Sequence, residues 1–459
     1  MNKIKKIFLI ILISLFTCFS YACVDKQEAN EPDEIVDPSG NQGEKAKTTP
    51  RFKEDYTPTL FSSVTYEEKE IVDGLILYTY TLTKANGDIT IINELEADLN
   101  KVRIEAGTKD NKALGYAFQK VVPYEAATSY TQATNKQVYA SLNADFFGSV
   151  CVNAFVKDGI IIKDSHNDNN NYDYLNSASD VPASAPMLFG IKGNTAQVAP
   201  IISYSGDIKS AIVKMPVIKA KLSYTINTGI KSIDTSDSLK IVTSALAVNA
   251  DDMYALLDLS KGVNDIEVLE IGIVDKKMTL IAPSANKAYL YCASSNTEGL
   301  SFLNRVSVGS KISLSVKSPD GLWNGYETIL GCRQALVMGS NVASTVTLEN
   351  TNGAQGADIP RSAVGINVDG KVCIYAVESL YYGRKANEGD SHGCDLPTLA
   401  EFMVYNNIVN GANFDGGGST QLICKIDGVD KVVVRSSDTG STELASTRQV
   451  MNVIMVVEK

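Results

Sequence analysis

The sequence predicts an α+β fold that is rich in strands, has few helices, and is built on mixed or antiparallel sheets. Runs of β-branched and aromatic residues recur along the 459-residue chain, and Asn-Gly or Asp-Gly pairs separate several of them. Such two-residue turns are typical of β-hairpins. One stretch, near 396–410, has helical periodicity instead. Hydrophobic residues make up 44% of the chain and charged residues 21%, so an ample core is expected.

Three hairpins and a closing strand are expected. The hairpins join 75–83 to 88–92 across Asn86-Gly87, 363–368 to 371–377 across Asp369-Gly370, and 422–426 to 431–434 across Asp427-Gly428. The closing strand is 450–457.

The predicted helix begins at Asp395, a candidate N-cap, and Pro397 sits in its first turn, where a missing N–H is harmless. One apolar face is formed by residues at helical spacing: Leu396, Leu399, Ala400, Met403, Val404 and Ile408. Gly411 is expected to end the helix. The helix is then expected to lead straight into a glycine-rich loop.

The N-terminus predicts export. Three lysines precede an apolar run over 7–16 that is too short to span a bilayer, so residues 1–22 are expected to be a signal peptide. Ala22-Cys23 resembles a bacterial lipobox, although Ser20 stands where leucine is usual. This resemblance implies lipidation of Cys23 and attachment to the outer membrane or its periplasmic face. Ordinary cleavage after Ala22, which releases a soluble protein, is the alternative.

Residues 23–50 are acidic, proline-containing and almost free of large apolar side chains, so they are expected to form a disordered tether. The remainder is predicted as an N-terminal β-rich region over 51–134 and a second domain over 135–459. A strand-rich insertion near 205–300, or a separate β-domain there, interrupts the second. Loss of residues 1–22 changes the net charge from −11 to −14. Nucleic acid is therefore not an expected partner, because its binding needs a basic surface.

Six cysteines remain after Cys18 and Cys23 are set aside: Cys151, Cys292, Cys332, Cys373, Cys394 and Cys424. Their spacing lacks a metal-binding pattern. Disulfides and buried free thiols both stay open.

The segment most suggestive of chemistry is Asp415-Gly416-Gly417-Gly418-Ser419. Three glycines allow positive φ and let backbone amides converge on an anion. Asp415 beside them could act as an acid, base, nucleophile or metal ligand. The alternative is a flexible turn that Asp415 caps.

Other candidates are weaker taken singly. Asn143 and Asp145 end an apolar strand and could bind sugar hydroxyls or a calcium ion, or simply cap a turn. Arg361 starts an apolar strand, and its guanidinium suits phosphate. Of the two histidines, His392 stands before the predicted helix and is the better candidate, whereas His166 lies in an Asn-rich loop.

Taken in order, these segments resemble the phosphodiester glycosidase family. The matching motifs are Asn143-Ala144-Asp145-Phe146-Phe147, Ile329-Leu330-Gly331-Cys332, Arg361-Ser362-Ala363-Val364-Gly365, Asn413–Ser419 and Arg448-Gln449-Val450. The resemblance covers roughly 135–200 and 325–459. Arg333 follows the second motif, where a pocket wall could form.

The resemblance implies hydrolysis between a sugar's anomeric carbon and a phosphodiester oxygen. Arg361 and the Gly416–Gly418 amides would then neutralise the phosphate, Asp415 or Asp145 would activate water, and Asn143 would orient a hydroxyl. Ser419 and His392 join the candidate substrate ligands, and Arg448 would contact the phosphate or brace Asp415. The resemblance fixes no cofactor, and calcium stays an alternative.

One departure from the family pattern keeps other functions open. The family often has Glu early in the helix, where this chain has Thr398, although Glu401 lies three residues on. A surface lipoprotein that binds glycans without cleaving them is the main alternative. A structural component of the cell envelope is the third, and it predicts no pocket near Arg361.

Overall fold

The computed structural model describes residues 51–163, 187–200, 222–228, 232–235, 239–318, 321–347, 353–379 and 390–459. The chain divides into two compact units, Met1–Thr48 and Thr49–Lys459, and every described residue belongs to the second. The expected signal peptide, Cys23, the tether and His166 lie outside the described residues. Within the described ranges, no helix combines the length and hydrophobicity needed to cross a membrane.

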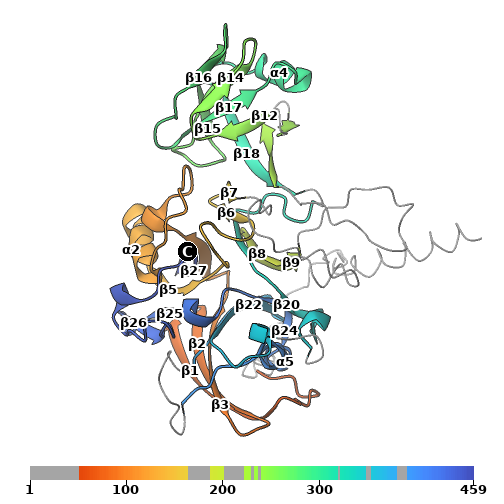
Figure 1. Cartoon of the computed structure of the whole chain (residues 1–459), viewed down its shortest axis with the longest axis vertical. Coiled ribbons are helices and arrows are strands. Elements are labelled where there is room, and N and C mark those ends of the chain that lie inside the picture. Colours follow the sequence, from red (N-terminus) through yellow and green to blue (C-terminus); the bar gives the residue numbers. More distant parts are fainter. Residues whose placement is uncertain are drawn as a thin grey trace, which may run out of the picture. The chain divides into compact units, whose positions relative to one another are not determined.

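The described chain is strand-rich, and its named strands pair antiparallel, as expected from the hairpin signals (Figure 1). The largest sheet has the order β1 (Phe61–Val72), β2 (Leu75–Lys84), β3 (Ile89–Ala97), β23 (Val372–Val377), β22 (Arg361–Asn367), β24 (Ile408–Asn413), β20 (Ala335–Met338) and β21 (Asn341–Val342). β3 pairs directly with β23, so residues of the N-terminal region share a sheet with residues of the C-terminal part.

Two five-stranded sheets, together with the largest sheet, form most of what is here called the body. One has the order β26 (Val429–Val434), β25 (Leu422–Ile426), β5 (Val138–Asn143), β27 (Val453–Glu458) and β4 (Val102–Gly107). The other has the order β7 (Ile160–Lys163), β6 (Phe155–Lys157), β19 (Thr328–Gly331), β8 (Met187–Lys192) and β9 (Thr195–Pro200). Short 3-10 turns lie at Lys109–Asn111, Ser344–Val346, Gly353–Gln355, Gly417–Ser419 and Leu444–Ser446.

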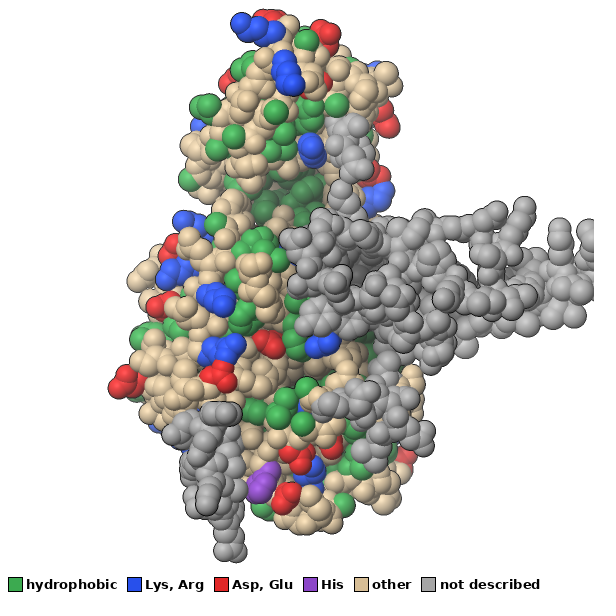
Figure 2. All heavy atoms as spheres, in the orientation of Figure 1, with side chains coloured by type: hydrophobic (Ala, Val, Ile, Leu, Met, Phe, Trp, Pro, Cys, Tyr) green, Lys and Arg blue, Asp and Glu red, His purple; other side chains and the backbone are tan. Residues whose placement is uncertain are grey.

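The strand-rich stretch predicted near 205–300 forms a seven-stranded sheet, here called the insertion sheet. Its order is β11 (Ser232–Asp234), β10 (Ser223–Asn227), β18 (Lys311–Lys317), β15 (Ile266–Ile273), β14 (Met253–Asp258), β17 (Lys287–Cys292) and β12 (Leu239–Val242). Two further strands from the same stretch, β13 (Leu246–Val248) and β16 (Met278–Leu280), form a separate small sheet. The core of the insertion sheet is continuous with that of the body. Val156 and Ile329 of the body pack in the same cluster as Leu257 and Leu314 of the insertion sheet. Figure 2 shows hydrophobic side chains gathered between the two on one face.

Three α-helices are present in the described residues: α2 (Pro123–Thr134), α4 (Thr297–Leu303) and α5 (Leu396–Tyr405). α2 covers the sheet that contains β5 and β27, through Ala126 and Tyr130. α5 packs against the largest sheet, where Phe402 meets Tyr80 edge-on with ring centroids 4.9 Å apart.

The predicted end of α5 is wrong. Asp395 does cap the helix, accepting from the Thr398 amide at 2.7 Å, but the helix ends at Tyr405 and not near residue 410. Asn407 has φ 60°, which turns the chain out of the helix, and Ile408–Asn413 form strand β24 between β22 and β20. Gly411 is therefore a strand residue. A side chain there would collide with Met403 of α5, so glycine permits the close approach of helix and sheet.

The three expected hairpins are confirmed: β2 pairs with β3, β22 with β23, and β25 with β26. The backbone reaches positive φ in each turn, at Gly87, at Gly370, and at Asp427 and Gly428. The six remaining cysteines are all buried free thiols, which decides between the two alternatives left open by their spacing.

Candidate active site

The glycine-rich segment is held where β5 and β24 end and β22 begins. The Asp415 amide donates to the Ala144 carbonyl at 2.9 Å, and the Asn143 side-chain amide donates to the Asp415 carbonyl at 2.6 Å. The Asn143 side-chain oxygen accepts from the Ser362 hydroxyl at 2.9 Å and from the Gln421 amide at 3.3 Å. Asn143 is fully buried, so these contacts make it a clamp on the Asp415 loop.

The three glycines make room for neighbouring groups. The Gly417 amide donates to the Pro360 carbonyl at 2.9 Å, and Gly417 has φ 59°. The Gly416 amide donates to the Asp415 carboxylate, as does the Ser419 hydroxyl. A side chain at Gly418 would overlap the carboxylate of Asp438. Two of the three amides expected to form an anion nest are therefore used within the chain.

Asp145 is a second carboxyl group at this centre, and it is 1% exposed. Its oxygens accept from the backbone amide of Asn153 at 3.0 Å and from the side-chain amide at 3.4 Å, and its own amide donates to Asn452 at 3.0 Å. Burial raises the pKa of Asp145 to about 7, against these hydrogen bonds and the positive charge of Lys163, and the charge of Asp415 raises it further. Asp145 therefore keeps a proton up to nearly neutral pH.

Asp415 differs from Asp145 because it is partly exposed and faces cations. Burial raises its pKa to about 6, while the Ser419 hydrogen bond and the charges of Arg448 and Arg333 oppose that shift. Asp415 is thus the one of the two that a substrate can reach. A pair of carboxyl groups whose pKa values are both raised towards neutrality is typical of acid–base sites.

The cations near Asp415 come from two segments. Arg448 pairs with Asp438, and both side chains are partly exposed. The Arg333 guanidinium lies over the Phe146 ring, 5.3 Å from its centroid. The arrangement places a reachable carboxylate beside positive charge, which suits a substrate with an anionic group next to the reacting atom.

Arg361 is held through Nε and one of its two terminal nitrogens. Its side chain donates to four backbone carbonyls: Cys394 at 2.9 Å, Ala354 at 2.6 Å, Gln355 at 3.2 Å and Ala357 at 2.8 Å. It is 6% exposed, and burial lowers its pKa. Through these contacts Arg361 holds the 353–357 turn against Cys394, and its expected role in phosphate binding stays a prediction.

Arg361→Lys should lower the free energy of unfolding by on the order of 3 kcal/mol, because one ammonium cannot satisfy carbonyls that a guanidinium fork bridges. Arg448→Lys, at an exposed position, should change it by less than about 0.5 kcal/mol. Urea unfolding of both variants checks this. A fully stable Arg361→Lys protein with weakened substrate binding would show that Arg361 binds the phosphate of the substrate.

His392 and Glu401 are also placed by the structure. The His392 backbone bridges Ser379 and Ile89, and no hydrogen bond described for these residues joins its imidazole to Asp415. Both oxygens of Glu401 accept from the segment at Thr59 and Leu60, at 2.7 to 2.8 Å. Glu401 therefore anchors the N-terminal segment and does not replace the carboxylate that the family often has at Thr398.

Gly331 is needed beside Asp145. A methyl group at Gly331 would lie 2.6 Å from the Asp145 carboxylate and would also overlap Asn153. Gly331→Ala should thus displace the carboxyl group, lower kcat at least tenfold, and cost about 1–3 kcal/mol of stability. Steady-state rates and thermal unfolding test this. Gly148→Ala, where nothing lies within 4 Å, is the matched control and should match the parent protein.

Three residues of the site escaped sequence reasoning. Asn153, eight residues along the chain, and Asn452, from a distant segment, orient Asp145, and Asp438 pairs with Arg448. Asn153 and Asn452 carry no local motif, because a buried hydrogen bond between distant segments leaves no spacing signal. Gly418 was the available clue to Asp438, since its missing side chain marks the space that the carboxylate fills.

Comparison with known proteins gives one matching family model and several solved structures of low sequence identity. The phosphodiester glycosidase family model matches residues 272–457. No curated protein sequence matches the chain. A hypothetical protein from Synechocystis has a similar structure, at 13% identity and a TM-score of 0.48, with 88% of this chain and 64% of that one covered.

A second similar structure is the zebrafish N-acetylglucosamine-1-phosphodiester alpha-N-acetylglucosaminidase catalytic domain, auto-inhibited by its pro-peptide. The two chains are 12% identical with a TM-score of 0.39, and 89% of this chain and 86% of that one are covered. The family match alone confirms the resemblance expected from the sequence, over residues 272–457.

Proposed function

We propose that this protein hydrolyses the bond between a sugar's anomeric carbon and the phosphate of a sugar-1-phosphodiester in a cell-envelope or host-derived glycan. The observation that carries the proposal is the pairing of Asp145, buried with a pKa of about 7, with the reachable Asp415, whose pKa is about 6. Arg448 and Arg333 supply positive charge on the side of Asp415. The family match supports the same reaction class.

In the proposed reaction, water attacks the anomeric carbon as the bond from that carbon to the phosphate oxygen breaks. The Asp415 carboxylate accepts the proton of the water, and the sugar leaves with the new hydroxyl group. The phosphate monoester takes the electron pair of the broken bond, and Arg448 offsets its charge. Phosphate is a good leaving group and needs little protonation, so the step depends mainly on the ionised carboxylate and the cation beside it.

The rate should rise with pH through about 6. Asp415 must be ionised to accept a proton, and burial raises its pKa to about 6, so the active form grows as pH increases through that value. A pH profile of kcat/KM checks this. A rate that falls as the pH rises through 6 would show that the protonated form of Asp415 is the active one.

A panel of sugar-1-phosphodiesters, including N-acetylglucosamine-1-phospho compounds, tests the proposal. Release of a phosphate monoester would be followed with and without calcium, which also tests the metal alternative. Turnover that Asp415→Asn abolishes supports the enzyme. Absence of turnover across the panel, with sugar binding retained, supports the second candidate.

The second candidate is a surface protein that binds glycans without cleaving them. The observation that favours it is Thr398, which is buried at the start of α5 where the family often has Glu. Glu401, the nearest carboxylate on the helix, is fully occupied by Thr59 and Leu60. Binding that is unchanged in Asp415→Asn, without turnover by the parent protein, distinguishes this candidate.

We further propose that the chain is exported and lipid-anchored through Cys23, with residues 23–50 as a tether. The apolar run and the Ala22-Cys23 pair support this. Metabolic labelling with a fatty acid should mark the parent protein and leave Cys23→Ser unlabelled. Equal labelling of both would contradict the anchor.

A further inference from the structure

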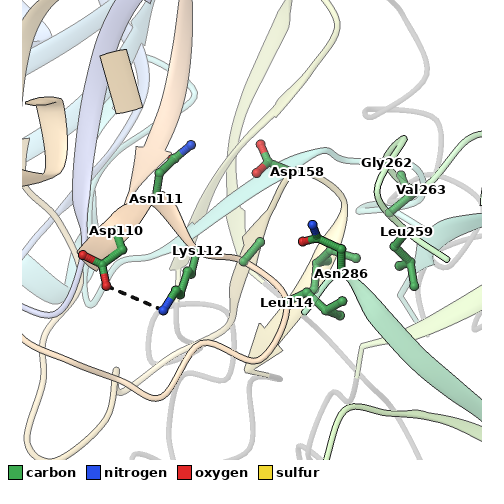
Figure 3. Close-up of a pocket in the computed structure, with 11 residues that line it drawn as sticks. Asp110, Asn111, Lys112, Leu114, Asp158, Leu259, Gly262, Val263 and Asn286 are labelled. Carbon is green, nitrogen blue, oxygen red and sulfur yellow. Dashed lines mark ion pairs between the residues drawn. The ribbon is translucent and has the colours of Figure 1, made fainter. Parts of the chain in front are cut away.

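A cavity of about 310 Å³ lies away from Asp145 and Asp415, where the body meets the insertion sheet (Figure 3). One wall comes from the turn that contains Asp110 and Asn111, and the opposite wall comes from the loops that contain Val263 and Asn286. Asp158, in the turn between β6 and β7, also lines it. We propose that this cavity, the insertion pocket, binds a neutral sugar unit of a glycan.

The polar lining suits hydroxyl groups. Four residues present carboxylate or amide groups: Asp110, Asn111, Asp158 and Asn286. Carboxylate and amide oxygens accept hydrogen bonds from sugar hydroxyls, and amide nitrogens donate to them.

The apolar lining suits the carbon face of a sugar ring. Leu114 and Ile160 of the body and Leu259 and Val263 of the insertion line the same cavity. Such a mixture of aliphatic wall and few polar groups is common in small-molecule pockets, which start at about 300 Å³. A single calcium ion needs six to eight oxygens at about 2.3–2.6 Å and would leave most of this volume unfilled.

The charges favour a neutral ligand over an anionic one. Lys112 pairs with Asp110 at 3.6 Å, and the fully buried Lys157 faces Asp158 at 3.3 Å. Each of these two cations is thus already offset by a carboxylate at the pocket. A phosphate would meet the carboxylates of Asp110 and Asp158 there, whereas a neutral sugar can donate its hydroxyls to them.

Backbone and side-chain contacts hold both walls. The Leu259 amide donates to the Asn286 carbonyl at 2.8 Å, which joins the two insertion loops. The Tyr224 hydroxyl accepts from the Ile161 amide at 2.6 Å, which joins the insertion sheet to the strand β7 beside the pocket. The insertion therefore completes the pocket, and its occupancy does not depend on turnover at Asp415.

The test is binding of neutral mono- and disaccharides of glucose, galactose, mannose and N-acetylglucosamine to the full-length protein, by saturation-transfer NMR and calorimetry. Asn111 and Asn286 both have positive φ, so Asn111→Gly and Asn286→Gly remove the amides without backbone strain. Ala113→Trp fills the cavity instead. Asn135→Gly, at the exposed end of α2 with φ 58°, is the matched control.

At least one of these sugars should bind the parent and Asn135→Gly equally. Binding should weaken about tenfold or more in each pocket glycine variant, and Ala113→Trp should abolish it. Binding unchanged in Ala113→Trp, or lost in Asp415→Asn, would place the sugar elsewhere and overturn the inference. Failure of every sugar to bind the folded parent would overturn it too, whether or not the protein hydrolyses phosphodiesters.

Discussion

Asp415→Asn should lower kcat by about 10²- to 10⁴-fold, the range expected when a general base is lost. Asn keeps the size of the side chain and can still accept from Ser419 and Gly416, but it cannot take a proton from water. Binding of the sugar-1-phosphodiester should persist because Asn143 clamps the loop through the Asp415 backbone carbonyl, which the substitution leaves in place.

The matched control is Asp427→Asn in the exposed turn between β25 and β26, where φ is 53° and Asn is well tolerated. Asp427 pairs only with the surface Lys69 at 2.8 Å among the described ion pairs. Steady-state kinetics should give parent rates for this control. Full activity of Asp415→Asn would remove Asp415 from the chemistry and leave Asp145 as the acid–base candidate.

Arg51→Ala should lower the free energy of unfolding by about 3–5 kcal/mol, because it leaves a buried carboxylate without its cation. Arg51 forms ion pairs with Glu94 and Glu96 and lies over the Tyr78 ring, 3.8 Å from its centroid. Glu94 is fully buried, and the Tyr80 hydroxyl donates to it at 2.6 Å.

The same network explains why these carboxylates are a poor metal site. Among the described residues, Glu94, Glu96 and Cys373 lie close enough to share an ion. However, Arg51 and Lys371 already offset both carboxylates, and Lys371 lies 2.7 Å from Glu96. These ion pairs attach Arg51 to strand β3.

Chemical unfolding of Arg51→Ala beside Lys101→Ala measures the effect. Lys101 pairs with Asp73 at 2.9 Å, but both side chains are more than half exposed, so its loss should cost no more than about 1 kcal/mol. Equal stabilities of the two variants would show that Arg51 contributes no more than a surface charge.

The hairpins could be predicted because their information is local. Asn86-Gly87 and Asp369-Gly370 combine turn chemistry with flanking strand residues, and both turns occur as expected. The end of α5 could not be predicted in the same way. Ile408 fits a helical apolar face and equally fits a strand between two neighbours, so periodicity alone leaves the boundary undecided.

The residues of the site also differ in whether a local sequence pattern predicts them. The glycines beside Asp415 marked the loop, since three consecutive glycines need a steric reason, and Gly418 faces Asp438. The backbone contacts of Arg361 could not be predicted, because a guanidinium that suits phosphate suits backbone carbonyls equally well. Its partners at Ala354, Ala357 and Cys394 become visible only when the chain is folded.

The most direct test of the proposed reaction is hydrolysis of a sugar-1-phosphodiester in water labelled with heavy oxygen, with mass analysis of the released phosphate monoester. Attack of water at the anomeric carbon, with Asp415 as base, predicts a phosphate monoester without the label. A labelled phosphate would show that water attacks phosphorus, and it would contradict the assignment of this centre as a glycosidase.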